Sequence, residues 1–251
     1  MWNPAVLTDI EGTTTDIAFV HKVLFPYSRE RIGPFVANNA DDPEVRAALA
    51  EIRASEGSSD MALDEIVLLL LRWIDEDRKA KPLKTLQGLI WRQGYESGVL
   101  KSHLYADVAP ALRRWHGAGL ALFVYSSGSV AAQKLLFANT GDGDLTPLFS
   151  GFFDTAVGPK VEARSYAAIL QSIGRDGPAV LFLSDHDGEL AAARSAGLRA
   201  IKLDRSRASD RPPAMEGGVS VVSSFDWIEP AAESGLRGYE PPRSFPTMSL
   251  M

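Results

Sequence analysis

The sequence predicts an α/β fold in which a central parallel sheet is flanked by helices and carries an all-helical insertion after its first strand. Two fully apolar runs, Leu120–Tyr125 and Ala179–Leu183, indicate strands that are covered on both faces. The stretch from 19 to 104 shows helical spacing and lacks the alternation of a strand. The predicted parts are a core of residues 1–18 and 105–230, a helical domain over 19–104, and a C-terminal tail over 231–251 without fixed structure.

Composition and charge restrict the functions that this chain can have. Of its 251 residues, 45% are hydrophobic and 23% are charged, which is ordinary for a globular protein. The net charge of −6 and the lack of a basic block argue against nucleic acid and anionic membranes as partners. Because there is no cysteine, disulfides, thiol catalysis and zinc–thiolate sites are excluded.

The chain also lacks the patterns of a secreted or membrane protein. The first residues, with Pro4 and Asp9, do not form the apolar stretch of a secretory signal. The longest aliphatic run, Ile66–Leu71, is too short to span a bilayer. We therefore expect a cytoplasmic protein without a membrane partner.

The N-terminal segment Leu7–Thr14 contains the first candidate site. A buried strand should end at Leu7, and Gly12 permits a sharp turn after it. Because side chains two apart on an extended segment point the same way, Asp9 and Glu11 should project into one site. Two carboxylates so placed repel each other unless a cation or a proton lies between them. A polar strand end with a capping aspartate is the alternative interpretation.

The helical insertion should form a bundle with its own apolar core. Its predicted helices are Val20–Asn38, Pro43–Ser55, Leu63–Ala80 and Lys84–Ser97. Apolar residues of the third helix recur at spacings of three and four, as the buried face of a helix requires. We expect Trp73 and Trp91 to belong to this core, since buried aromatic residues are common.

From Ala106 onward the pattern alternates between helix and strand. Asp107 is a candidate N-cap for the first helix, and the stretch from Phe152 to Lys160 should be irregular. The predicted elements are the helices Val108–His116, Val130–Phe137, Ser165–Ile173 and Glu189–Ser195, and the strands Leu120–Tyr125, Ala179–Leu183, Ala200–Leu203 and Val219–Val222. This order predicts parallel βαβ units, whose ligands bind beyond the carboxyl ends of the strands.

Three further groups of polar residues follow predicted strands. Ser126 and Ser127 open a Ser-Ser-Gly-Ser turn, where hydroxyl and backbone N–H groups suit a phosphate oxygen. Lys160 precedes a helix, and Asp185 opens an acidic cluster after the second apolar run. Taken singly, these groups have simpler explanations: a capping serine, a solvated lysine and an acidic helix N-terminus.

Together these residues supply the groups that phosphoryl transfer requires. A βα array brings the ends of its strands together, so Asp9, Ser126, Lys160 and Asp185 should meet. Asp9 would attack phosphorus and form an aspartyl-phosphate, while Lys160 stabilises charge on the phosphoryl oxygens and Ser126 anchors one of them. Magnesium would bind through carboxylate and carbonyl oxygens, with Asp185 as the second carboxylate ligand. His186 is not expected to be a ligand, because magnesium prefers oxygen.

With these residues in place, the chain resembles the enolase-phosphatase E1 family of methionine salvage, within the haloacid dehalogenase superfamily. The resemblance spans about Leu7 to Ile201 and implies a Rossmannoid core of that superfamily with a helical cap over 19–104. The blocks that carry it are Asp9-Ile10-Glu11-Gly12-Thr13-Thr14-Thr15, Ile17-Ala18-Phe19-Val20, Leu24-Phe25-Pro26-Tyr27, Trp91-Arg92-Gln93-Gly94-Tyr95, Tyr125-Ser126-Ser127-Gly128-Ser129-Val130, Gln133-Lys134-Leu135-Leu136-Phe137, Gly158-Pro159-Lys160-Val161-Glu162 and Leu181-Phe182-Leu183-Ser184-Asp185.

The resemblance implies one magnesium ion per subunit and a role for each motif residue. Glu11 distinguishes the family, because other phosphatases of the superfamily usually carry a second aspartate there as the general acid-base. The metal would contact the main-chain oxygen of Glu11. The implied residues are Asp9, Glu11 and Lys160 for catalysis, Ser126, Ser127 and Lys160 for substrate binding, and Asp9, Glu11 and Asp185 for the metal.

The resemblance also implies the substrate, 2,3-diketo-5-methylthiopentyl 1-phosphate. The enzyme would enolise this diketone and then remove its phosphate to give the acireductone 1,2-dihydroxy-3-keto-5-methylthiopentene. The base that removes the carbon proton stays open between Glu11 and a residue of the cap. The cap would exclude water, and its apolar lining, with Phe19 and Phe25 as candidates, would receive the methylthio tail.

Two other functions compete with this interpretation. One is a haloacid dehalogenase-type phosphatase for another small phosphorylated metabolite, with the same core and different cap contacts. The other is a non-catalytic binding module, which is hard to reconcile with the intact set of Asp9, Ser126, Lys160 and Asp185. In either enzymatic case we expect a monomer.

One segment departs from the family pattern. In the family, the strand after the fourth motif usually runs into Arg-Pro and a short loop with Asn or Gly. Here Leu203 leads into the longer and more charged segment 204–212, for which no role is predicted.

Overall fold

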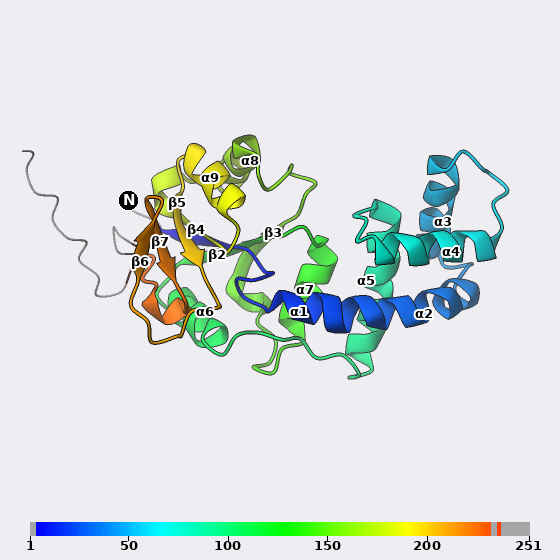
Figure 1. Cartoon of the computed structure of the whole chain (residues 1–251), viewed down its shortest axis with the longest axis horizontal. Coiled ribbons are helices and arrows are strands. Elements are labelled where there is room, and N and C mark those ends of the chain that lie inside the picture. The colour runs from blue at the N-terminus through cyan, green and yellow to red at the C-terminus, as the bar shows by residue number, and fades with distance from the viewer. Residues whose placement is uncertain (1–3, 232–234, 237–251) are drawn as a thin grey trace, which may run out of the picture.

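The molecule has two lobes, one built around a sheet and the other formed by helices alone (Figure 1). The computed structural model describes residues 4–231 and 235–236. Over these residues the sheet has seven strands in the order β3-β2-β1-β4-β5-β7-β6, and every pairing is parallel except that of β6 with β7. The strands are β1 Ala5–Thr8, β2 Ala121–Tyr125, β3 Phe149–Phe153, β4 Val180–Ser184, β5 Arg199–Leu203, β6 Ala214–Glu216 and β7 Val219–Val222.

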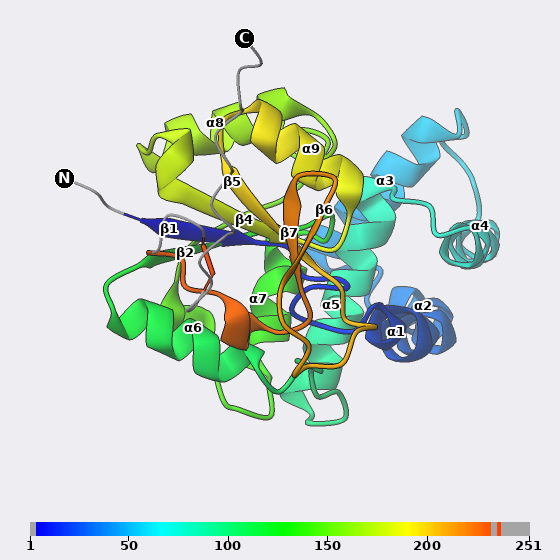
Figure 2. The ribbon, with the colours of Figure 1, turned by 60° about the vertical axis from the view of Figure 1, so that its left-hand side comes forward.

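Helices cover both faces of this sheet, as the apolar strands require. Figure 2 shows α6 and α7 on one side and α8 and α9 on the other. Successive strand residues alternate between the two apolar layers: Val6 packs with the α6 side and Leu7 with the α8 side. The helices of this lobe are α6 Val108–Gly117, α7 Val130–Ala138, α8 Ala163–Ile173 and α9 Asp187–Ser195. The predicted α/β fold with a central parallel sheet is confirmed.

The helical lobe is inserted between β1 and α6 and has an apolar core of its own. Trp73, Leu70 and Ile90 lie in a cluster of buried residues separate from both layers of the sheet. The chain enters the lobe through one long helical stretch in which α1, a π turn and α2 follow without a break, and Figure 1 shows this stretch running from the sheet into the second lobe. The elements of this lobe are α1 Ile17–Phe19, the π turn Val20–Leu24, α2 Phe25–Asn38, α3 Pro43–Ser55, α4 Leu63–Asp75 and α5 Lys81–Glu96.

Three local predictions were wrong. The stretch around Phe152, expected to be irregular, is the edge strand β3. Helix α4 was predicted to continue to Ala80 but ends at Asp75, because Asp77 adopts a positive φ of 50° and the next helix begins at Lys81, with Pro82 in its first turn. Asp107 does not cap α6 with its side chain, because Arg205 occupies its carboxylate.

Most of the predicted tail 231–251 lies outside the described residues. Of its part that the structure does describe, Leu236 is buried and pairs with Ile228 in an antiparallel bridge. No helix in the described part of the chain combines the length and the hydrophobicity that crossing a membrane requires.

Candidate active site

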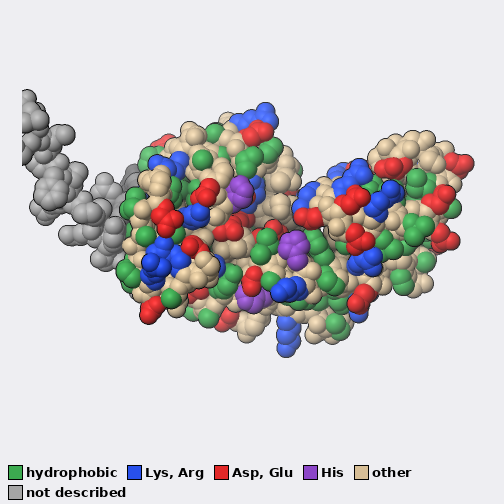
Figure 3. All heavy atoms as spheres, in the orientation of Figure 1, with side chains coloured by type: hydrophobic (Ala, Val, Ile, Leu, Met, Phe, Trp, Pro, Cys, Tyr) green, Lys and Arg blue, Asp and Glu red, His purple; other side chains and the backbone are tan. Residues whose placement is uncertain are grey.

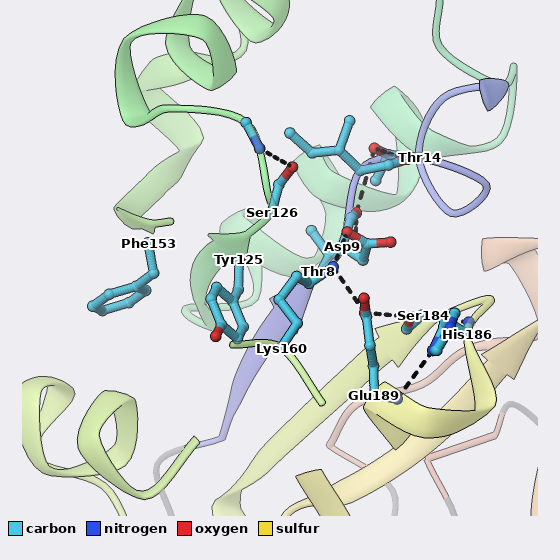
Figure 4. A network of polar contacts seen from close by, with 12 residues as sticks. Thr8, Asp9, Thr14, Tyr125, Ser126, Phe153, Lys160, Ser184, His186 and Glu189 are labelled. Atoms are coloured by element: carbon cyan, nitrogen blue, oxygen red, sulfur yellow. Dashed lines mark hydrogen bonds and ion pairs between the residues drawn. The ribbon is translucent and has the colours of Figure 1, made fainter. Parts of the chain in front are cut away.

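The candidate active site lies at the carboxyl ends of the three central strands. Because β1 pairs in register with β2 on one side and with β4 on the other, the residues that follow these strands emerge side by side. Asp9 follows β1, Ser126 follows β2 and Asp185 follows β4. Figure 4 shows Lys160 reaching the same edge from the loop before α8. The structure thus brings together the residues that the sequence analysis selected.

Lys160 is held between two carboxylates. Its Nζ lies 2.5 Å from Oδ1 of Asp9 and 2.8 Å from Oε2 of Glu189. The side chains are only 10%, 7% and 12% exposed for Lys160, Asp9 and Glu189, so the three charges are largely removed from water. Burial by itself would lower the pKa of Lys160, but the two carboxylates outweigh it and raise that pKa. Lys160 is therefore a fixed cation, aimed at the oxygen of Asp9.

Glu189 is a site residue that the sequence analysis did not select. It lies in the first turn of α9, and its Oε2 accepts a hydrogen bond of 2.9 Å from the Ser184 hydroxyl. Burial, and then the charge of Asp9, raise the pKa of Glu189. Its position in the acidic cluster that Asp185 opens, four residues further along the chain, was the available signal. His186 caps α9, because its Nδ1 accepts the N–H of Glu189.

Gly12 brings the turn after β1 against the carboxylate of Asp185. Its φ is 73°, and a Cβ at this position would collide with that carboxylate, so the turn needs glycine both for its conformation and for space. The turn closes through the N–H of Gly12, which donates to the carbonyl of Thr15 over 2.8 Å. Asp185 is thereby held close to Asp9, and burial, followed by the charge of Asp9, raises the pKa of Asp185.

Glu11 lies at the border between the strand ends and the helical lobe. Its pKa is raised, first by burial and then by the charge of Asp9, while Lys79 and Lys160 act in the opposite direction. Lys79 belongs to the connection between α4 and α5, so a residue of the helical lobe acts electrostatically on a residue of the strand ends. A raised pKa favours the protonated form of Glu11, which suits proton exchange near the bound substrate.

The loop after β2 is held in place by several hydrogen bonds. Ser126 is buried, and its Oγ accepts the N–H of Gly128 over 3.2 Å (Figure 4). Ser129 caps α7 by accepting the N–H of Ala132. Gln133 donates 2.8 Å hydrogen bonds to the carbonyls of Gly128 and of a β3 residue, which ties the loop to the sheet edge. Hydroxyl and backbone donors at the start of a helix suit phosphate oxygens.

The carboxylates of this edge fit a hard cation. Among the described residues, no three His, Cys, Asp or Glu side chains gather in a metal-binding arrangement. Asp9 and Asp185 supply two carboxylates, and main-chain oxygens or water would complete the ligand set. The pKa of Asp185 is raised partly by Asp9, which means that the two charges repel each other and that a cation between them would relieve the repulsion. Such an all-oxygen set favours magnesium or a similar ion.

A mostly apolar pocket opens from these strand ends into the space between the two lobes, and Figure 3 shows a hollow there. Its floor includes Glu11, Ser126 and Ser127. The helical lobe contributes apolar side chains, Gln87 and four charged residues, of which three belong to the connection between α4 and α5 and the fourth, Lys84, to α5. These lobe residues are Val20, Leu24, Phe25, Trp73, Ile74, Asp77, Arg78, Lys79, Leu83, Lys84, Gln87, Trp91 and Tyr95.

The lining of this pocket differs from the prediction at two aromatic residues. Phe25 lines the pocket as expected, but Phe19 does not, because it packs in a small cluster with Leu100 and Tyr95. Trp91, expected in the core of the bundle, is only partly buried and faces the pocket, while its Nε1 donates to the carbonyl of Leu24 over 2.9 Å. Trp73 is buried in the bundle core, as predicted.

The segment after β5, which had no predicted role, supports the turn that holds the carboxylates. Arg205 donates to the carbonyl of Thr13 over 2.6 Å through Nη2 and over 3.0 Å through Nε. Its Nη1 pairs with Asp107 at 2.8 Å, and both side chains are nearly buried, at 9% and 14% exposure. The guanidinium also stacks on Tyr105, 4.3 Å from the ring centroid. One arginine therefore fixes both chain segments that join the two lobes.

Comparisons with solved structures agree with this architecture. The UTR4 protein of Saccharomyces cerevisiae superposes with a TM-score of 0.75 at 33% sequence identity, over 90% of this chain and 100% of that one. CbbY of Rhodobacter sphaeroides, at 17% identity and a TM-score of 0.53, shares the fold over 89% of this chain and 95% of its own.

Sequence comparisons place the chain in a family. A family model of haloacid dehalogenase-like hydrolases matches residues 4–197. Enolase-phosphatase E1 of Parvibaculum lavamentivorans is 58% identical over 92% of this chain and 97% of its own length. Enolase-phosphatase E1 of Pseudomonas aeruginosa is 51% identical over 89% of this chain and 97% of its own. The chain therefore belongs to the haloacid dehalogenase-like hydrolases and, within them, to the enolase-phosphatase E1 family.

Proposed function

We propose that this protein is the enolase-phosphatase of methionine salvage. It enolises 2,3-diketo-5-methylthiopentyl 1-phosphate and then hydrolyses the phosphate to give 1,2-dihydroxy-3-keto-5-methylthiopentene. The observation that carries the proposal is the 2.5 Å contact of Lys160 with Asp9 at the strand ends, beside an apolar pocket that is lined by Glu11, Ser126 and the helical lobe. The relatives named enolase-phosphatase E1 support the same substrate class.

The phosphatase step uses the fixed groups at the strand ends. Asp9 attacks phosphorus, the bond from phosphorus to the substrate oxygen breaks, and an aspartyl-phosphate forms that water then hydrolyses. Lys160 stabilises the charge on the phosphoryl oxygens, and Ser126, Ser127 and the loop N–H groups bind them. Glu11, whose raised pKa favours its protonated form, can give a proton to the departing oxygen.

Magnesium is the proposed cofactor, one ion per subunit. Asp9, Asp185 and the main-chain oxygen of Glu11 would hold it, in keeping with the all-oxygen character of this edge. When bound, the ion supplies positive charge that offsets the carboxylates and the phosphate dianion.

The helical lobe, residues 19–104, is proposed to act as a cap. Its apolar wall, including Phe25 and Leu83, receives the methylthio tail, and its position over the strand ends keeps water from the diketone. The base that takes the carbon proton is Glu11 or a cap residue. We propose that the enzyme is a monomer. Its phosphorylated metabolite substrate supports a cytoplasmic location.

Rapid mixing of enzyme and magnesium with the diketone phosphate tests the function. Absorbance of the conjugated enol should rise first, and release of inorganic phosphate should follow it. Release of phosphate with no preceding enol stage would count against the enolase activity. A strong preference for an unrelated sugar phosphate in a substrate panel would favour a phosphatase for another metabolite.

A further inference from the structure

Lys84 is a cap residue that reaches the phosphate-binding loop of the core. It lies in the first turn of α5, is partly buried, and its Nζ donates a hydrogen bond of 2.9 Å to the main-chain carbonyl of Ser127. The same side chain lines the pocket together with Glu11. Lys84 therefore links the helical lobe to the loop after β2 at the wall of the pocket.

The ammonium of Lys84 has no carboxylate partner within the described part of the chain. Neighbouring lysines of the cap differ in this respect: Lys79 pairs with Asp77 at 2.6 Å, and Lys81 pairs with Glu51 at 3.5 Å. An ammonium carries three donors, and a single neutral carbonyl satisfies one of them. A partly buried cation without a counter-ion is stabilised when an anionic ligand, or a ligand that develops negative charge, enters the pocket.

The position of Lys84 relative to the other groups indicates which part of the ligand it meets. In the proposed function, Lys160 and Ser126 of the core bind the phosphate oxygens of the substrate. Lys84 belongs to the cap, where it lies between the Ser127 carbonyl and the apolar pocket lining that includes its buried neighbour Leu83. In the proposed substrate, two carbonyl groups lie between the phosphate and the apolar tail, so we expect a carbonyl oxygen to lie near this ammonium.

We propose that Lys84 binds the carbonyl oxygen of C2, the one nearest the phosphate, and stabilises the negative charge that this oxygen gains during enolisation. The proposal rests on the proposed function and assigns the group that selects a diketone. In the step, a base removes a proton from C1 and the C–H electron pair forms the C1=C2 double bond. The carbonyl π pair moves onto the C2 oxygen, which takes up a proton to give the enol. A cation fixed beside that oxygen lowers the energy of the enolate.

The cap holds Lys84 in a defined place, as such a role requires. Pro82 lies in the first turn of α5 and fixes its own φ there, and Leu83 is buried next to Lys84. One turn later, buried Gln87 donates from Nε2 to the Ser28 hydroxyl at 3.3 Å, which ties α5 to α2. The helix is thus anchored on both sides of the lysine, and only the side chain is free to exchange the Ser127 carbonyl for a substrate oxygen.

The test compares Lys84→Met with Lys81→Met on the same helix. Lys81 is 83% exposed and lies outside the pocket lining, so its variant controls for loss of one cap charge. Each enzyme is mixed with magnesium and the diketone phosphate while enol absorbance and phosphate release are recorded. Lys84→Met should slow enol formation by about 100-fold, the cost of removing one donor from a developing oxyanion. KM should change much less, because the interaction strengthens only as charge develops.

A second substrate separates this role from damage to the site. Hydrolysis of p-nitrophenyl phosphate, which has no carbonyl, should fall by only about threefold or less in Lys84→Met, whereas the diketone phosphate loses about 100-fold. An equal loss on both substrates, or enol formation within about threefold of the parent, would overturn the proposal. If the parent enzyme itself forms no enol from the diketone phosphate, the proposed function fails instead, so the two failures are distinguishable.

Discussion

At the residue scale, the site is a cluster of carboxylates that one lysine cannot neutralise. Asp9, Glu11, Asp185 and Glu189 converge on Lys160, and the pKa values of Glu11, Asp185 and Glu189 are all raised by burial first and by Asp9 second. Without a bound cation, the ionised forms of these carboxylates are therefore disfavoured. The repulsion between these buried carboxylates destabilises the metal-free protein, and it favours the binding of a cation or of a proton at the site.

Asp185→Asn should stabilise the metal-free protein at neutral pH. The pKa of Asp185 is raised in the folded state above its ordinary value of 3.8, so the folded protein holds this proton more tightly than the unfolded chain. Its contribution to stability is full below pH 3.8 and is lost as pH rises through the higher folded pKa. The neutral amide avoids that loss, so in a chelator the variant should melt about 2–4 °C above the parent at pH 7.

Two conditions check this assignment. The difference in melting temperature should disappear as the pH falls below the ordinary carboxyl range, where the parent is protonated as well. Addition of magnesium should reverse the order at pH 7, because the parent gains stability by binding the ion and the variant has lost a ligand. A variant that melts below the parent in chelator at pH 7 would show that Asp185 is not repelled by its neighbours.

Gly12→Ala should reduce activity far more than stability. A Cβ at Gly12 would push the Asp185 carboxylate away from its place, and the φ of 73° adds strain for any other residue. Gly98→Ala is a matched control, because Gly98 has the same φ of 73° with open space around its Cβ position. Both variants should lose about 1 kcal/mol of stability, but only Gly12→Ala should need at least about tenfold more magnesium for half-maximal activity. Equal magnesium dependence in the two variants would contradict the steric argument.

At the scale of elements, Arg205 links the turn after β1 to the chain that returns from the cap. It binds the Thr13 carbonyl at the start of the outgoing segment and stacks on Tyr105 at the end of the returning one. Its partner Asp107 also accepts the backbone N–H of Phe225 at 2.6 Å. The segment after β5 thus anchors the two chain segments that connect the core to the cap.

Arg205→Met should destabilise the protein by about 3 kcal/mol, because it leaves the nearly buried Asp107 carboxylate without its cation. Denaturant unfolding with far-UV circular dichroism measures the loss. In the double variant Arg205→Met/Asp107→Asn the unpaired carboxylate charge at position 107 is absent, so part of the stability should return. If the double variant is less stable than the single one, the buried charge is not the cause of the loss.

Element predictions succeeded where the apolar pattern was continuous and failed at the edges of the sheet. The central strands β2 and β4 are buried on both faces, so their aliphatic runs were visible in the sequence. Strand β3 contains Ser150 and Gly151 and is only partly buried, because it pairs on one side alone. The short β6, with Met215 and Glu216 exposed, exists through its pairing with β7 and left no pattern to detect.

At the scale of the whole molecule, the pocket belongs to neither lobe alone. The strand ends could be predicted, because the topology of a parallel sheet brings them together whatever lies between them in the chain. The cap contacts could not, because they depend on how the bundle sits over the sheet. In the sequence, Trp91 and Lys84 look like ordinary residues of the bundle. They line the pocket only because α5 packs against the core. Arg205 was missed for the same reason, since its partners are distant in the sequence.

Chemical trapping of the enzyme during turnover tests the central claim, that Asp9 is the nucleophile of a site assembled from strand ends. An aspartyl-phosphate is reduced by borohydride to homoserine, which peptide mass spectrometry locates in the sequence. With magnesium and the diketone phosphate present, homoserine should appear at position 9 and should be absent without substrate. Homoserine at another acidic residue, or continued turnover by Asp9→Asn without any trapped residue, would contradict the account.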